Sequence, residues 1–300
     1  MEPIESFSPQ NNIKKFYIGI TFVFVFVVSY FLFSAPAHST PTTIHIAKKE
    51  SLHTLSIELK NKNVIRSTRV FELFVKVFKG DKGIQTGDYF FENNFSSWRI
   101  AWMVARGYHN VTPVRITLRE GLTNENIAEI LFKNLPNFNK DRFMSEVKGK
   151  QGRLFPDTYF IFPLSTIDEI VSSMEDNFDN HMDELNKDIK SSNHNLTDII
   201  KMASIIEKES AGESDAPTIS GILWKRISMK MPLQVDASPV TYKVVGLPSE
   251  SISNPGIVAI KAAIYPKDSP YLYYLHDKGG VVHYAVTFKE HKSNIAQYLK

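Results

Sequence analysis

The most constraining feature of this chain is a run of eighteen residues from Phe16 to Phe33 that carries no charge and contains eight aromatic residues. A helix of that length rises about 27 Å, close to the hydrocarbon thickness of a lipid bilayer. Two lysines precede the run, and no basic residue follows it until Lys48. Because basic flanks stay on the cytoplasmic side, we expect a cytoplasmic tail over residues 1–15 and a single membrane-spanning helix over 16–34.

A cleaved signal peptide is the alternative interpretation of the same run, with Ala35 and Ala37 at the cleavage site. The run is longer than the usual apolar core of a signal peptide, about 7–15 residues, and Pro36 is awkward beside a cleavage site. We therefore favour an inner-membrane anchor that exports everything after it. Residues 35–42, rich in Ser, Thr and Pro, are expected to form an extended tether.

Composition excludes several classes of protein. The 300 residues are 43% hydrophobic and 22% charged, which is typical of a globular chain rather than a disordered one. A net charge of +3 gives no indication of a nucleic-acid partner. The absence of cysteine excludes disulfides and thiolate ligands. The nine histidines form no HExxH pair, so we expect neither a metal site nor a cofactor.

The exported part divides into a small module and a larger domain. Hydrophobic spacing predicts a strand, two amphipathic helices and a returning strand between residues 43 and 91, followed by a helix over 97–106. The rest is mostly helical until strands return near the C-terminus, and its clearest predicted helices cover residues 124–134, 167–189, 195–210 and 218–229. The predicted class is α+β, with a small βααβ module over 43–113 and a helix-rich α+β domain over 114–300.

The predicted helix over 195–210 is where chemistry is expected. Asn195 is suited to cap its start, and Ile199, Ala203 and Ile206 belong to an apolar stripe. Glu207 extends that stripe, so its carboxyl should be partly desolvated and its pKa raised, which a general acid requires. Glu209 points about 200° away around the helix and cannot share a site with Glu207 while the helix continues. A surface charge at a helix end is the alternative interpretation of Glu207.

The segment Ala203–Ser210 resembles the signature of the endolytic murein transglycosylases, the MltG or YceG-like family. Further blocks of that family occur in the family's order, and they cover Leu154–Tyr159, Leu233–Asp236, Gly246–Pro248, Ser253–Gly256, Ala262–Ala263, Tyr271–Tyr273 and Glu290–His291. The resemblance extends over nearly the whole chain, including the anchor. The small module resembles the LysM-like domain that lies beside the anchor in this family.

The resemblance implies lytic cleavage of the MurNAc–GlcNAc β-1,4 bond of peptidoglycan strands, with a 1,6-anhydro end on the product. The family's catalytic glutamate is matched to Glu207, which would act as general acid and then as base. Substrate-binding roles are implied for Gln234, Asp236 and Asn254. A purely structural role in a turn is the alternative for Asp236 and Asn254. Tyr159 and Glu209 are two further candidates. The expected substrate-binding residues are therefore Gln234, Asp236, Asn254, Tyr159 and Glu209. The family also suggests work beside the peptidoglycan synthases.

Two alternatives remain at this stage. Water in place of the sugar's own C6 hydroxyl would make the protein a muramidase on the same scaffold. The chain is also shorter than the family pattern between Asp236 and Gly246, and has Gln151 where the family has Glu before Gly152. A non-catalytic glycan-binding envelope protein, inactive through its shortened loop, is therefore the third interpretation.

Overall fold

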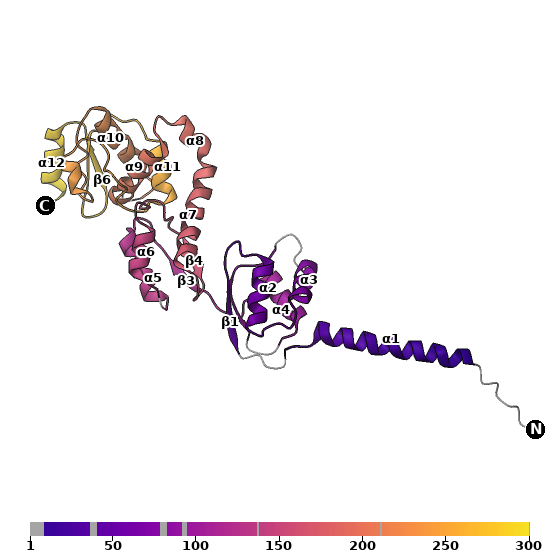
Figure 1. Ribbon diagram of the computed structural model, residues 1–300. Helices are drawn as coiled ribbons and strands as arrows, with labels where there is room; N and C mark the ends of the chain where they lie inside the picture. Colours follow the sequence, from indigo (N-terminus) through magenta and orange to yellow (C-terminus); the bar gives the residue numbers. More distant parts are fainter. Residues whose placement is uncertain are drawn as a thin grey trace, which may run out of the picture. The chain divides into compact units, whose positions relative to one another are not determined.

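The structure is a computed structural model that describes residues 9–36, 41–78, 83–91, 95–136, 138–210 and 212–299. The chain divides into two compact units, Met1–Pro113 and Val114–Lys300 (Figure 1). Parts of the predicted tail, residues 1–8, and of the predicted tether, residues 37–40, lie outside the described residues. The mixture of helices and small sheets confirms the α+β class.

Helix α1 (Pro9–Phe33) covers the uncharged run and begins earlier than the predicted helix. Its described apolar side chains between Phe16 and Tyr30 are exposed, and Phe22 and Phe26 each have a relative exposure of 73%. Within the described part of the chain, however, no helix combines the length and the apolarity that crossing a membrane requires. The structure therefore supports a helix over residues 16–33 but not the predicted membrane-spanning segment.

The rest of the first unit has the predicted strand–helix–helix–strand order. Its elements are β1 (Thr42–Ile46), α2 (Leu52–Asn61), α3 (Thr68–Phe78), β2 (Gly87–Phe91) and α4 (Ser97–Arg106). Strands β1 and β2 are antiparallel, with Ile44 opposite Tyr89, and both side chains are fully buried. The Ser51 hydroxyl accepts a hydrogen bond from the backbone of Thr54 and caps α2. The likeness of this unit to a LysM domain stays a prediction.

The second unit contains two two-stranded antiparallel sheets and a group of helices (Figure 1). Its strands are β3 (Val114–Thr117), β4 (Thr158–Ile161), β5 (Tyr273–His276) and β6 (Val282–Ala285), and its helices are α5 (Asn124–Asn134), α6 (Lys140–Glu146), α7 (Ile167–Glu184), α8 (Asn186–Ser191), α9 (Leu196–Glu209), α10 (Ala216–Ser228), the 3₁₀ helix η1 (Pro239–Tyr242), α11 (Ile257–Ile264) and α12 (Phe288–Tyr298). Strand β3 pairs with β4, and β5 pairs with β6.

Helix α9 is the centre of the larger core. It packs against α10 and α11, and every residue from Met202 to Ile206 is buried, so apolar contacts surround its last full turns instead of covering one face. A second core lies between the β3–β4 sheet and helices α5, α6 and α7. The burial of α9 on all sides departs from the one-sided apolar stripe that the sequence indicates.

Three elements of this unit differ from the sequence-based expectation. The single helix predicted over residues 167–189 is two helices, α7 and α8, which meet at Leu185. Strand β4 and helix α11 were not predicted. The four residues of β4 are too few to show a period, and five of the eight residues of α11 are buried, so its apolar residues do not repeat on one side.

The two cores are joined by hydrogen bonds of Asn254, which is 1% exposed. Its Oδ1 accepts from the backbone N–H groups of Gly152 at 2.8 Å and Leu154 at 3.0 Å. Its Nδ2 donates to the carbonyl of Leu122 at 3.1 Å and to the side-chain oxygen of Asn124 at 2.9 Å. One amide side chain therefore connects the segment before α11 with the start of α5 and the loop before β4.

Replacing Asn254 with Ala should lower the free energy of unfolding by about 3 kcal/mol or more, because two buried N–H groups lose their acceptor and two acceptors lose a donor. Chemical denaturation followed by circular dichroism measures the change. Asn134→Ala is the matched control, since Asn134 is exposed and makes one side-chain bond, to the carbonyl of Ile130. It should cost about 0.5 kcal/mol or less. Equal losses in the two variants would contradict the connecting role of Asn254.

Candidate active site

The end of helix α9 presents two carboxyl side chains, as the sequence predicts. The side chain of Asn195 accepts a hydrogen bond from the backbone of Asp198 at 2.9 Å, which confirms the predicted cap and fixes the register of the helix. The helix ends at Glu209, and both Glu207 and Glu209 are half-buried. Because these residues are two positions apart, they leave the helix in different directions and line different cavities.

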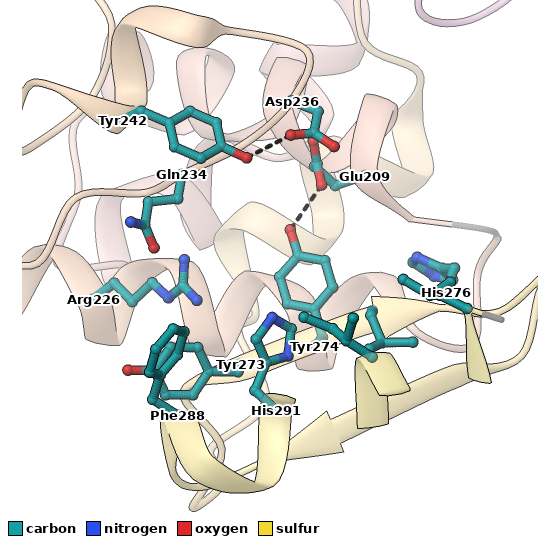
Figure 2. Close-up of a pocket in the computed structure, with 13 residues that line it drawn as sticks. Glu209, Arg226, Gln234, Asp236, Tyr242, Tyr273, Tyr274, His276, Phe288 and His291 are labelled. Atoms are coloured by element: carbon teal, nitrogen blue, oxygen red, sulfur yellow. Dashed lines mark hydrogen bonds between the residues drawn. The ribbon is translucent and has the colours of Figure 1, made fainter. Parts of the chain in front are cut away.

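Glu209 lines a cavity of about 540 Å³, which we call the Glu209 cavity (Figure 2). Its lining combines carboxyls, an amide, a guanidinium and aromatic rings: Glu209, Arg226, Gln234, Asp236, Tyr242, Tyr273, Tyr274, Leu275, His276, Phe288, His291, Ile295 and Leu299. These residues come from α9, α10, the loop before η1, η1 itself, strand β5, helix α12 and the residue after it. The cavity therefore gathers three of the predicted substrate-binding residues, Glu209, Gln234 and Asp236.

The carboxyl of Glu209 is held in a partly desolvated, hydrogen-bonded setting. Burial raises its pKa, and the hydroxyl of Tyr274, which donates to Oε2 at 3.0 Å, opposes that shift. The negative charge of Asp236 acts in the same direction as burial. Tyr274 is itself half-buried, and desolvation holds its pKa well above the ordinary value, so its hydroxyl stays a donor. Glu209 thus has the raised pKa that a general acid needs.

Gln234 and Asp236 reach the cavity because of an unusual backbone. Gln234 has a φ of 52°, a left-handed conformation that is uncommon outside glycine. Its neighbours Leu233 and Val235 are fully buried, and they hold the segment while Gln234 turns toward the cavity. The hydroxyl of Tyr242 donates to Oδ1 of Asp236 (Figure 2). Such local strain is common where a side chain is positioned for function.

Glu207 lies in a second cavity, of about 440 Å³, which we call the Glu207 cavity. Its lining residues are Thr117, Leu118, Arg119, Glu120, Pro156, Asp157, Thr158 and Glu207. Burial raises the pKa of Glu207, and the charge of Glu120 adds to the shift. The backbone N–H of Gly256 donates to Oε2 of Glu207 at 3.0 Å and opposes the shift. The structure therefore does not bring Glu207 together with Gln234 and Asp236.

The last two predicted site residues line neither of these cavities. Asn254 is buried and all its side-chain hydrogen bonds described above are internal, so the structure gives it a connecting role. The hydroxyl of Tyr159 donates to the carbonyl of Phe155 at 2.6 Å, and its ring packs against the β3–β4 core. Neither side chain is placed where it would contact a ligand in the Glu209 cavity.

Sequence reasoning missed several lining residues. Tyr274 lies next to the Tyr271–Tyr273 block and Tyr242 lies within the shortened loop, so both had a weak signal in the motif pattern. Arg226 had none, because a basic residue in the last turn of a helix is normally an exposed one. In the part of the chain that the structure describes, no three His, Asp or Glu side chains are grouped to hold a metal ion.

The chain matches the sequence pattern of the YceG-like family over residues 44–240 and 239–297. It belongs to the YceG-like family. These ranges take in both α9 and every residue that lines the Glu209 cavity except Leu299.

Relatives of this YceG-like protein include two that carry the name endolytic murein transglycosylase. One, from Bacillus subtilis strain 168, is 26% identical over an alignment that covers 87% of this chain and 85% of the relative. The other, from Streptococcus pneumoniae strain D39, is 23% identical, and the match covers 86% of this chain but 58% of the relative. A solved structure described as a YceG-like protein from Listeria monocytogenes is similar, with a TM-score of 0.56 and 25% identity, and covers 85% of this chain and 99% of that one.

The raised pKa of Glu209 predicts a pH dependence of stability. The folded protein binds this proton more tightly than the unfolded chain, so the free energy of unfolding should fall as pH rises from the ordinary value of 4.5 through the raised pKa. Glutamine has no proton to lose. We therefore expect Glu209→Gln to lose less stability than the unaltered protein between that pH and neutrality.

Thermal or chemical unfolding at several pH values measures this difference. Glu213→Gln, at an exposed carboxyl shortly after the same helix, is the control and should leave the pH slope of stability as it is. Parallel slopes for Glu209→Gln and the unaltered protein would contradict the assignment of the raised pKa to Glu209.

Proposed function

We propose that this YceG-like protein is an endolytic murein transglycosylase, which cleaves the MurNAc–GlcNAc β-1,4 bond of peptidoglycan strands and leaves 1,6-anhydro-MurNAc ends. The names of its relatives support the substrate class. The observation that carries the proposal is the half-buried carboxyl of Glu209 in a cavity lined by amide, carboxyl and aromatic side chains. Such a lining suits sugars, which present hydroxyl and N-acetyl groups together with apolar faces.

The first step needs a proton on the leaving group. Protonated Glu209 donates its proton to the glycosidic oxygen while the bond from that oxygen to the anomeric carbon breaks. Positive charge then develops on the MurNAc ring, as in other glycosidic cleavages. The carboxylate left on Glu209 and the carboxyl of Asp236 face the same cavity, where they can stabilise that charge.

The second step closes a ring within the sugar. The C6 hydroxyl of MurNAc attacks the anomeric carbon, and the carboxylate of Glu209 accepts the hydroxyl proton, so the enzyme returns to its starting state. No water is consumed, and the spacing rule for two-carboxylate glycosidases does not apply to this reaction. Tyr274 keeps the Glu209 carboxyl in one orientation through both transfers by its 3.0 Å hydrogen bond.

Glu209 is the better-placed acid of the two carboxyls at the C-terminal end of α9. Both carboxyls accept a backbone hydrogen bond, Glu209 from Ala237 and Glu207 from Gly256, but Glu209 shares its cavity with Gln234 and Asp236, whereas Glu207 shares its cavity with Glu120. A Cβ atom at position 256 would collide with the side chain of Glu120, so a larger residue there would displace that carboxyl. We therefore assign the acid–base role to Glu209, and not to Glu207 as expected from the sequence. Glu207 instead stabilises the turn before α11.

Glu209→Gln should lower the rate of strand cleavage about a hundredfold or more, since an amide cannot donate or accept the catalytic proton. Glu207→Gln is the matched variant, two residues away on the same helix, and should keep most of the activity of the folded protein. The measurement uses uncrosslinked glycan strands and mass spectrometry of the new chain ends.

The products decide between reaction types. Ends lighter by one water, formed by the unaltered protein and not by Glu209→Gln, support the lytic reaction. Ordinary reducing ends would make the protein a muramidase on this scaffold. Loss of cleavage in Glu207→Gln with cleavage retained in Glu209→Gln would return the acid role to Glu207. Strand binding without cleavage in every protein would indicate a glycan-binding envelope protein.

We also propose that α1 attaches the enzyme to the cytoplasmic membrane, with the second unit on the outer side, where peptidoglycan lies. The support is the uncharged sequence from Phe16 to Phe33 and the exposure of its large apolar side chains, such as Phe22 and Phe24. A large exposed apolar surface of this kind needs a cover other than water. Work beside the peptidoglycan synthases stays a prediction from the family.

Cell fractionation tests the attachment. We expect the full chain in the membrane fraction and a chain of residues 35–300 in the fraction released without detergent, because the apolar surface of α1 is then missing. Replacing Phe22 and Phe26 with Asp should shift the full chain toward the released fraction. Recovery of the full chain without detergent would contradict the proposal.

A further inference from the structure

A buried positive charge lines the Glu209 cavity and takes no part in the proposed proton transfers. Arg226 lies in the last turn of α10 and is 5% exposed, although it carries a full charge. Burying an isolated charge is costly, so buried arginines normally pair with a carboxylate. The buried guanidinium of Arg226 therefore calls for an anionic partner.

The partners of Arg226 within the described residues are all neutral. Its Nε donates to the carbonyl of Leu272 at 2.7 Å, and Nη1 donates to the carbonyl of Leu233 at 2.6 Å. Its guanidinium carbon lies 5.1 Å from the centre of the Tyr273 ring. Throughout the described part of the chain, no carboxylate lies within ion-pair distance of it, and the structure gives Nη2 no hydrogen-bond partner there.

The two carbonyl bonds fix the guanidinium plane and leave one edge free. An arginine fork held in this way offers parallel N–H groups to a carboxylate at little further entropy cost. Figure 2 shows the Arg226 side chain extending from its helix toward Gln234, with Tyr273 and Phe288 on the other side. The free edge is therefore directed at the cavity that holds Glu209.

Burial lowers the pKa of Arg226, and Glu209 and the surrounding tyrosines act in the opposite direction through space, without an ion pair to the guanidinium in the described part of the chain. Burial lowers the pKa of His291, and the charge of Arg226 lowers it further, so this imidazole is kept neutral. Asp236 is engaged by the hydroxyl of Tyr242, and the pKa of Glu209 is raised by burial, which favours its uncharged form. The cavity thus has an acidic end at Glu209 and Asp236 and a cationic end at Arg226.

We propose that the free edge of Arg226 is a subsite for a carboxylate of the substrate. This inference rests on the proposed function, because peptidoglycan is the carboxylate-bearing polymer on which that function acts. Two groups of the polymer share this chemistry, the carboxylates of the stem peptide and the lactyl carboxylate of a MurNAc that has lost its peptide. Pairing the guanidinium with either one satisfies the buried charge and places the MurNAc ring beside Glu209.

The test measures strand binding separately from strand cleavage. Glycan strands with stem peptides and strands with the peptides removed are each prepared with free carboxylates and with the carboxylates converted to methylamides. Their dissociation constants are measured for the full-length Glu209→Gln protein, in which turnover is blocked, and for the same protein carrying Arg226→Met. Lys225→Met is the matched control, because Lys225 is a neighbouring cation of α10 that donates to the carbonyl of Ser269 and does not line the cavity.

Conversion to methylamides should weaken binding about tenfold or more when Arg226 is present, because it removes the charge-assisted hydrogen bond to the guanidinium. In Arg226→Met that hydrogen bond is already missing, so the same conversion should weaken binding less than twofold. Lys225→Met should behave like the protein with Arg226. An effect confined to peptide-bearing strands assigns the subsite to the stem peptide, and an effect confined to peptide-free strands assigns it to the lactyl group. Equal binding of free and methylamidated strands by the Arg226 protein overturns the proposal.

Two further readouts separate the possible failures. Arg226→Lys keeps the positive charge without the paired N–H groups of the guanidinium, and it should recover part of the preference for free over methylamidated strands. If Arg226 were merely structural, Arg226→Met would keep that preference in full. Cleavage by the unaltered protein with no effect of methylamidation would overturn the subsite alone. Carboxylate-dependent binding by a protein that cleaves no strand would overturn the proposed function and support the subsite.

Discussion

The arrangement of the second unit depends on the burial of helix α9. Contacts with α10 and α11 enclose its residues from Met202 to Ile206, so the last turn emerges from the core. The two carboxyls that follow are half-buried for that reason, and desolvation raises the pKa of both. A helix that packed on one face alone would leave one of these carboxyls in water. Because α9 is enclosed, both carboxyls are partly desolvated and have raised pKa values, and they lie on opposite sides of the helix.

The surroundings of the two carboxyls then determine what each can do. Glu207 faces a backbone N–H and a second carboxyl, a setting that stabilises a turn. Glu209 faces a tyrosine hydroxyl, an aspartate and a cavity of about 540 Å³, a setting with room for a ligand. The cavity is polarised, because Arg226 at its other end is held by two backbone carbonyls and has no anionic partner among the described side chains. The carboxyls of Glu209 and Asp236, the amide of Gln234 and the guanidinium of Arg226 therefore line one cavity, although they come from separate segments.

Much of this organisation could be predicted. The α+β class, the strand–helix–helix–strand order of the small unit and the cap at Asn195 follow from hydrophobic spacing and capping chemistry. The motif blocks identified the family and drew attention to Gln234 and Asp236. Strand β4 and helix α11 could not be predicted, because a four-residue strand shows little period and seven of the eight residues of α11 are apolar, so they do not mark one face. Asn254 lies in a Pro–Gly turn sequence, and its four side-chain hydrogen bonds reach partners 100 to 132 residues away.

The sequence by itself determined the family, the helix over residues 196–209 and the pair of glutamates at its end, because these depend on residue order and local spacing. From the sequence alone, the apolar stripe and the family motif favoured Glu207 over Glu209 as the general acid. An apolar stripe indicates a functional carboxyl only if one face of the helix is buried. Residues Met202–Ile206 of α9 are buried on all sides, so only the groups that surround Glu207 and Glu209 in space distinguish the two carboxyls. Tertiary structure also decided the role of Arg226. Whether an arginine is solvated or is an unpaired buried cation depends on which carbonyls and rings surround it, and these come from segments distant in the sequence.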